Sequence, residues 1–129
     1  MKIAVVGSRG LSVKDLAQYL PAYATELVSG GAKGIDACAR EYACQTGMKS
    51  TEFLPDYRRY GRAAPLHRNL EIIAYADEVI AFWDGQSRGT RFVIGECERR
   101  GKKVTVYRRP QKPDCVHGCF YIYLRGKEM

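Results

Sequence analysis

Short apolar runs alternate along this chain with longer stretches in which apolar residues recur at helical spacing. Apolar runs at positions 2–7, 25–28, 51–54, 78–83 and 103–107 predict five strands, and a run at 120–124 suits one more. Helical spacing predicts a helix that begins near Ser12 and ends before Pro21, and further helices over residues 35–46, 66–76 and 89–100. The runs at 2–7 and 78–83 are almost continuously apolar, as expected of parallel strands buried on both faces.

Strands that alternate with helices across short connections predict an α/β fold. We expect a three-layer sandwich with a mostly parallel five-stranded sheet and right-handed crossovers. In such a sheet, ligands bind at the carboxyl ends of the strands, near the point where the strand order switches. Polar turns follow the first, second and fourth predicted strands. We therefore expect these three turns to meet in one binding site.

The second of these turns is rich in glycine. Residues 29–36 read Ser-Gly-Gly-Ala-Lys-Gly-Ile-Asp and lead into a predicted helix. Glycines leave no side chain between backbone amides and a ligand, and a helix start carries unpaired N–H groups and partial positive charge, so such a turn suits phosphate. A tight turn that needs glycine only to bend is an equal alternative for this turn alone. The similar turns after the first and fourth strands favour anion binding.

Composition limits the class of protein. A chain of 129 residues with 46% apolar and 27% charged residues suits one ordinary globular domain. No apolar run approaches the roughly 20 residues of a membrane span, and the chain opens on a strand pattern without a signal-like segment, so we expect a cytoplasmic protein with no membrane partner. The net charge of +7 favours anionic partners without separating nucleotides from nucleic acid.

The C-terminal residues differ from the rest of the chain. We take residues 1–107 as the domain and residues 108–129 as a basic tail that is dispensable for the core fold. An odd number of cysteines, five, argues against a disulfide framework. Cys115, His117 and Cys119 in the tail are zinc-ligand types, but they supply three ligands at most. We expect no metal site there.

Four short motifs occur in order along residues 1–107. They are Gly7-Ser8-Arg9, the glycine turn at 29–36, Arg68-Asn69, and the turn Trp-Asp-Gly-Gln-Ser-Arg-Gly-Thr at 83–90. Together they resemble the YpsA-related branch of the SLOG superfamily, which joins DNA-processing protein A (Smf) proteins to the Lonely-guy phosphoribohydrolases. The resemblance implies a Rossmann-like fold that binds a nucleotide or nucleotide derivative. It implies a site built from Gly7, Ser8, Arg9, Gly30, Gly31, Ala32, Gly34, Asp36, Arg68, Asn69, Asp84, Gly85, Ser87, Gly89 and Thr90.

Several of these residues also suit a structural role. Asp36 fits ribose hydroxyls or the first turn of its own helix, and these readings are even. Ser87 and Thr90 fit phosphate, yet both are ordinary N-cap residues. Asn69 fits the ligand or its local backbone. Trp83 is expected to pack in the core.

The chain departs from the phosphoribohydrolases at one position. Those enzymes carry a Pro-Gly-Gly-X-Gly-Thr-X-X-Glu turn; here Gly89-Thr90 matches Gly-Thr, but Val93 stands at the glutamate position and Glu96 lies three residues further on. We therefore expect a nucleotide-binding sensor or module of a nucleotide-signalling or defence system. A nucleotide N-glycosidic hydrolase and a single-stranded DNA-binding protein stay open as alternatives, and so does self-association.

The segment 57–62 reads Tyr-Arg-Arg-Tyr-Gly-Arg, within a stretch expected to be irregular. Aromatic residues interleaved with arginines suit single-stranded nucleic acid, which they bind by stacking and phosphate contact. The alternative is a loop that folds over the ligand pocket as a lid. Because the segment directly precedes the helix of Arg68 and Asn69, we favour the lid.

Overall fold

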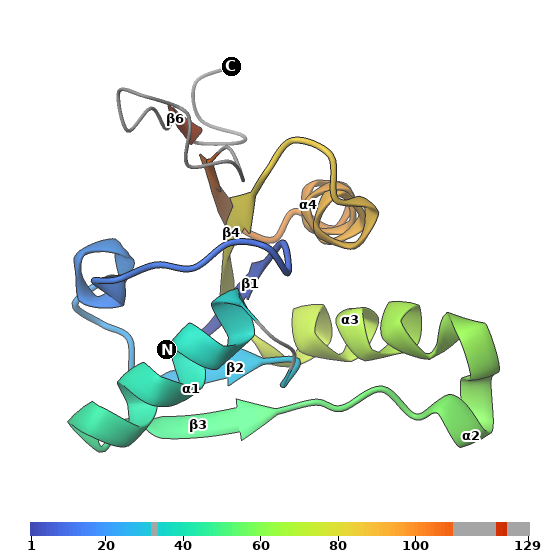
Figure 1. The fold of residues 1–129 in the computed structure, drawn as a ribbon, viewed down its shortest axis with the longest axis horizontal. Coiled ribbons are helices and arrows are strands. Elements are labelled where there is room, and N and C mark those ends of the chain that lie inside the picture. Colours follow the sequence, from blue (N-terminus) through green and yellow to red (C-terminus); the bar gives the residue numbers. More distant parts are fainter. Residues whose placement is uncertain (32–33, 110–120, 124–129) are drawn as a thin grey trace.

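The computed structural model describes residues 1–31, 34–109 and 121–123. The described strands are β1 (Lys2–Gly7), β2 (Glu26–Ser29), β3 (Lys49–Glu52), β4 (Glu78–Trp83), β5 (Val104–Arg108) and β6 (Tyr121–Tyr123) (Figure 1). The α-helices are α1 (Ile35–Thr46), α2 (Tyr57–Tyr60), α3 (Ala64–Tyr75) and α4 (Arg88–Arg100), and the 3₁₀ helices are η1 (Leu16–Tyr19) and η2 (Gly61–Ala63).

The strands form one sheet in the order β3-β2-β1-β4-β5-β6. β1 to β5 are parallel, and β6 adds to β5 in the antiparallel sense. The chain moves outward in one direction from β1 to β3 and in the other from β4 to β5, so the strand order switches between β1 and β4. The expected Rossmann-like α/β fold with a mostly parallel sheet is confirmed, with β6 as a sixth strand.

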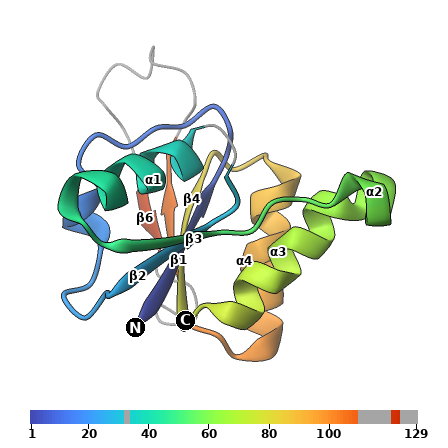
Figure 2. The ribbon, with the colours of Figure 1, turned by 90° about the horizontal axis from the view of Figure 1, so that it is seen from below.

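Helices cover both faces of the sheet. α1 and η1 lie on one face, and α3 and α4 lie on the other (Figures 1 and 2). Each face has its own apolar core. Ile3, Val5, Leu27 and Phe82 pack toward α1, whereas Ala4, Val6, Val28 and other residues pack toward α3 and α4. Alternate residues of β1 therefore serve opposite cores, which explains why this strand is apolar throughout.

The prediction of an α-helix that begins near Ser12 is wrong. This crossover has no α-helix and contains only the 3₁₀ turn η1, and the side chain of Asp15 caps no N–H group there. Leu11, Val13 and Leu16 are all buried against the α1 side of the sheet. An irregular segment buries Leu11 and Val13 at two-residue spacing and covers this part of the core, so a helix is not needed to bury the leucines.

The predictions of β1 over 2–7, β4 over 78–83 and α1 over 35–46 are confirmed, and the remaining boundaries shift by one to a few residues. β3 was expected over 51–54 because of Phe53 and Leu54, but it spans Lys49–Glu52, and Leu54 is 65% exposed. β3 pairs only with β2 among the described strands, and its mostly exposed side chains give no apolar signal. Residues 108 and 121–123 of the predicted tail belong to β5 and β6. Cys115, His117 and Cys119 lie outside the described residues.

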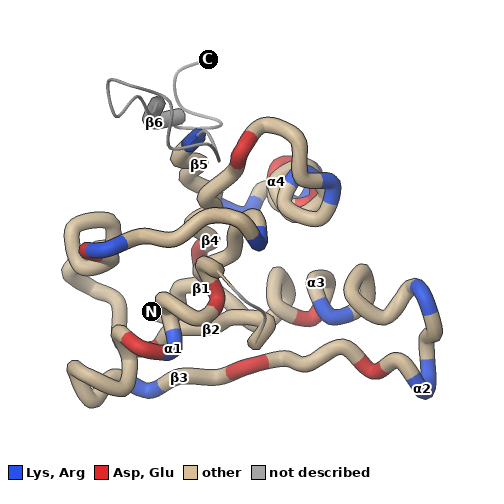
Figure 3. Tube along the Cα trace, viewed as in Figure 1, with Lys and Arg blue, Asp and Glu red and all other residues tan. Residues whose placement is uncertain are grey.

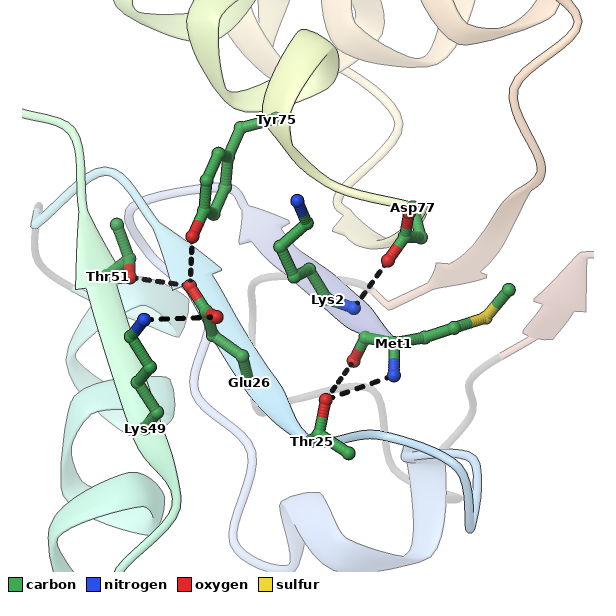
Figure 4. Close-up of polar contacts among 8 residues, drawn as sticks. All are labelled: Met1, Lys2, Thr25, Glu26, Lys49, Thr51, Tyr75 and Asp77. Atoms are coloured by element: carbon green, nitrogen blue, oxygen red, sulfur yellow. Dashed lines mark hydrogen bonds and ion pairs between the residues drawn. The ribbon is translucent and has the colours of Figure 1, made fainter.

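A polar network joins the strands at the amino-terminal edge of the sheet (Figure 4). The buried Glu26 carboxylate accepts hydrogen bonds from the Thr51 and Tyr75 hydroxyls, each at 2.6 Å, and Lys49 lies 3.7 Å away. Burial alone would raise the pKa of Glu26, but these hydroxyls and Lys49 outweigh it, and the pKa is lowered. The network holds β2, β3 and α3 together at the amino-terminal edge of the sheet. This edge lies opposite the carboxyl ends of the strands, where we expect a ligand.

None of the helices within residues 1–31 and 34–109 is long and apolar enough to cross a lipid bilayer.

Candidate functional site

A cavity of about 370 Å³ opens at the carboxyl ends of β1 and β4, where the strand order switches. Ligand sites in open parallel sheets form at this position. The cavity is bounded by the turns after β1, β2 and β4 and by one side of α3. Most of the residues predicted from the sequence line it: Gly7, Ser8, Arg9, Gly30, Asp36, Arg68, Asn69, Asp84, Ser87, Gly89 and Thr90.

The turn after β1 is held to the turn after β4 through Ser8. The buried Ser8 donates its backbone N–H to the carbonyl of Phe82 at 3.0 Å, and its hydroxyl accepts a hydrogen bond from the backbone N–H of Asp84 at 3.2 Å. Gly7 allows α1 to start against β1, because a Cβ here would overlap the side chain of Ile35 and lie 2.9 Å from the Phe82 carbonyl. These contacts fix two walls of the cavity relative to each other.

Arg68 links α3 to the glycine turn. Its Nη1 donates to the carbonyl of Gly30 at 2.7 Å, and its Nε donates to Oδ1 of Asn69 at 2.8 Å. Burial lowers the pKa of Arg68 and nearby Arg9 lowers it further, while Asp36 and Tyr57 act in the opposite direction. A guanidinium keeps its charge under such shifts, so the cavity contains a positioned cation close to a buried carboxylate, that of Asp36.

The turn after β4 places the start of α4 at the cavity. Oδ1 of Asp84 accepts the backbone N–H groups of Gln86 and Ser87, each at 2.8 Å. The Ser87 hydroxyl then caps α4 by accepting the N–H of Thr90 at 3.4 Å. Burial would raise the pKa of Asp84, but the N–H groups of Ser87 and Gln86 and the Ser8 hydroxyl more than offset this, and the pKa is lowered. Asp84 is thus an ionised residue that shapes the turn.

The remaining glycines predicted for the site shape the turns and are not among the residues that line the cavity. Gly31, Gly34 and Gly85 have φ angles of 71°, 73° and 88°, which L side chains rarely adopt. Gly34 is the N-cap of α1, and a Cβ there would lie 2.5 Å from the carbonyl oxygen of Arg9. Ala32 lies outside the described residues.

Apolar lining residues were not predicted. Val6, Pro65, Ile72 and Val93 complete the cavity wall. On α3, Pro65 and Ile72 are seven residues apart and share a helix side with Arg68 and Asn69, so helical spacing from the predicted Arg-Asn pair was a usable signal. Val6 is the penultimate residue of a buried strand, where a lining residue and a core residue look the same in sequence.

The prediction that residues 57–62 form a lid over the cavity is wrong. None of residues 57–62 lines the cavity, and α2 projects away from the body of the domain (Figures 1 and 2). The Asp56 carboxylate caps α2 by accepting the N–H of Arg59 at 3.2 Å. The ring of Tyr60 stacks on that of His67, with centroids 3.8 Å apart and planes 17° apart. These contacts hold the segment on α3 and not across the cavity mouth.

Glu96, which lies three residues beyond Val93 on α4, forms its contacts outside the cavity. It is not among the lining residues of the cavity, whereas Val93 is. Its carboxylate accepts hydrogen bonds from the guanidinium of Arg99 and lies 3.4 Å from that of Arg100. The Arg99 hydrogen bonds are the largest influence on Glu96 and lower its pKa, against the effect of burial. Glu96 therefore serves the ion pairs of α4.

Comparisons with known proteins find a similar phage protein. No family model matches the chain, and no solved structure matches it significantly. The chain is 36% identical over 88 residues to the Gene 61 protein of Mycobacterium phage D29. This match covers 64% of the chain and 70% of the phage protein.

Proposed function

The chain belongs to the family of the Gene 61 protein of Mycobacterium phage D29, and we propose that its cavity binds a nucleotide or nucleotide-derived small molecule. One observation carries the proposal. Turns that follow β1, β2 and β4, far apart in the sequence, contribute polar residues to a single cavity at the switch in strand order. Its volume of about 370 Å³ lies within the range of small-molecule sites.

The anionic part of the ligand is best accommodated at the start of α4. The first N–H groups of an α-helix lack intrahelical partners and carry partial positive charge. Gly89 stands in this turn, and a Cβ at its position would meet no atom within 4 Å, so the backbone is open toward the cavity. Arg9 and Arg68 add two cations to the wall. Phosphate suits this combination of helix start and guanidinium groups.

The rest of the wall suits the sugar and the base. Asp36 and Asp84 would repel a second phosphate, but their carboxylates accept hydrogen bonds from hydroxyl or amino groups. The apolar side chains of Pro65, Ile72 and Val93 offer a surface for a ring system. A ligand with one anionic end, hydroxyl groups and an apolar ring meets all of these features. Inorganic phosphate meets only the first.

We further propose that the protein binds this ligand without cleaving its glycosidic bond, as a sensor or module of a nucleotide-signalling or defence system. Glycosidic cleavage passes through an oxocarbenium-like state, which a carboxylate stabilises. In the resembled phosphoribohydrolases the helix after the Gly-Thr pair supplies a glutamate; here Val93 holds that position. The resemblance to YpsA-related proteins is part of this proposal.

A thermal-shift screen against purine and pyrimidine nucleotides and their ribose-containing derivatives tests the proposal. A ligand at a hundred times its Kd stabilises the folded state by about 2.7 kcal/mol, which raises Tm by several degrees. We expect at least one nucleotide to do so in the wild type and in Gly95→Val, but not in Gly89→Val.

The two valine variants are a matched pair. Both glycines lie on α4, and an added Cβ meets no atom within 4 Å at either, but only Gly89 lines the cavity. Gly31→Val would be a poorer test, because the positive φ angle of Gly31 strains any side chain. If no nucleotide shifts Tm, or if Gly89→Val responds as the wild type does, the proposed site is wrong.

A further inference from the structure

The segment Tyr57–Arg62, here called the arginine–tyrosine projection, is a second surface, outside the cavity. It comprises α2 and the start of η2 and stands out from the body of the domain (Figures 1 and 2). Its three arginines, Arg58, Arg59 and Arg62, are all exposed. None of them forms an ion pair with a described residue. Figure 3 shows this concentration of positive charge at α2.

Aromatic rings accompany these charges. Tyr57 is 57% exposed, so its ring is accessible to a partner. Tyr60 stacks on His67, and the guanidinium of Arg59 lies 5.2 Å from the Tyr60 ring centroid. The projection thus presents one exposed ring, one stacked pair and three cations within six consecutive residues and their immediate contacts.

The projection is held in place. Asp56 caps α2, and Gly61 ends it with a φ angle of 56°, which lets the chain turn into η2 and α3. The Tyr60–His67 stack fastens it to the side of α3. Because the backbone is already ordered, a partner would not need to order the segment when it binds.

We propose that the arginine–tyrosine projection binds single-stranded nucleic acid, with Arg58 and Arg62 contacting phosphates and Tyr57 stacking on a base. Arginines with interleaved aromatics are the combination that single strands require, because their bases are free to stack. A duplex keeps its bases stacked inside and would leave Tyr57 without a partner. An acidic polypeptide would match the charges but not the ring. This activity is separate from nucleotide binding in the cavity.

Fluorescence anisotropy with labelled oligo(dT)₂₀ over a series of salt concentrations tests the proposal. In the double variant Arg58→Gln/Arg62→Gln, we expect the affinity to fall at least tenfold. The slope of log K against log salt should become shallower by about 1.4, because each single-strand phosphate contact contributes about 0.7. The matched control is Lys14→Gln/Arg91→Gln, which removes the same charge from exposed residues outside the projection and should change affinity less than threefold.

Tyr57→Ala separates stacking from charge. Stacking on one base contributes about 1–3 kcal/mol, so we expect a loss of roughly fivefold to a hundredfold or more in affinity with an unchanged salt slope. All variants should retain the wild-type far-UV dichroism because the altered side chains are exposed. Nucleotide-induced thermal shifts should also persist in the double variant, which keeps this proposal distinguishable from that for the cavity.

Three results would overturn the assignment. One is no binding of oligo(dT)₂₀ by the wild type at 50 mM salt. A second is equal weakening in the projection and control variants, which would indicate only the net charge. The third is unchanged binding by Tyr57→Ala together with one of two observations: polyglutamate displaces the oligonucleotide, or a 20-base-pair duplex binds as tightly as the single strand.

Discussion

Replacement of Asp84, a residue of the cavity wall, should lower the free energy of unfolding of the domain. This carboxylate accepts two backbone N–H groups, those of Gln86 and Ser87, each at 2.8 Å. Hydrogen bonds to a charged group contribute about 1.5–3 kcal/mol each, and we take the lower value because Asp84 is only partly buried and water competes. We therefore expect Asp84→Ala to lower the free energy of unfolding by about 3 kcal/mol.

Asp84→Asn keeps the oxygen acceptor but removes its charge. Neutral hydrogen bonds contribute about 1 kcal/mol each, so we expect a loss of about 1 kcal/mol relative to the wild type. Urea unfolding followed by far-UV dichroism measures both values. The control is Asp15→Asn, since Asp15 is exposed and caps no N–H group; it should change stability by less than about 0.5 kcal/mol.

The effect of Asp84 should also depend on pH. Its pKa is lowered in the folded protein, so its stabilising contribution is complete above the unfolded pKa of about 3.9 and is lost as the pH falls through the folded pKa. The difference in stability between wild type and Asp84→Asn should therefore be constant from pH 7 to 5 and shrink below pH 4. A difference that persists unchanged to pH 3, or an Asp84→Ala variant as stable as the wild type, would refute this reasoning.

Other variants test the remaining parts of the structure. Glu26→Gln should lower the free energy of unfolding by about 2 kcal/mol, because two hydroxyl hydrogen bonds lose their charged acceptor; Glu52→Gln, which breaks only a surface ion pair, should lower it by less than 1 kcal/mol in the same urea titration. Gly7→Ala should cost about 1–3 kcal/mol, since its Cβ overlaps buried Ile35, as a lowered midpoint would show. Incubation with nucleoside monophosphates should release no free base by chromatography, because Val93 replaces the expected glutamate; turnover would reverse that expectation.

The overall architecture could be predicted from the sequence because the patterns of its central strands are unambiguous. β1 and β4 are buried on both faces and read as apolar runs, and the strand ends then follow from the parallel topology. The prediction for the first crossover was wrong because Leu11 and Val13 reach the core from an irregular segment at two-residue spacing, and Leu16 reaches it from the 3₁₀ turn η1, so burial of these residues needs no α-helix. β3 was misplaced because its pairing depends on the backbone of β2, not on its own side chains.

The site residues could be predicted where a polar residue or glycine stands at the end of a strand or the start of a helix. Ser8, Gly30, Asp36 and Thr90 follow or begin elements at one sheet edge, so topology brings them together. Sequence could not separate glycines that line a cavity from glycines that bend a turn, because both need the missing Cβ. It also could not place residues 57–62, because their position depends on the stacking of Tyr60 in α2 on His67 in α3.

Amide chemical-shift mapping with the nucleotide that most raises Tm tests the central claim most directly. On titration into ¹⁵N-labelled protein, the largest changes should fall on the three turns that bound the cavity, at Ser8 and Arg9, at Gly30, and at Gly89 and Thr90. Amides at the opposite edge of the sheet, around Glu26, should not move. Saturable changes confined to that edge or to the arginine–tyrosine projection, with the amide of Gly89 unaffected, would contradict the account.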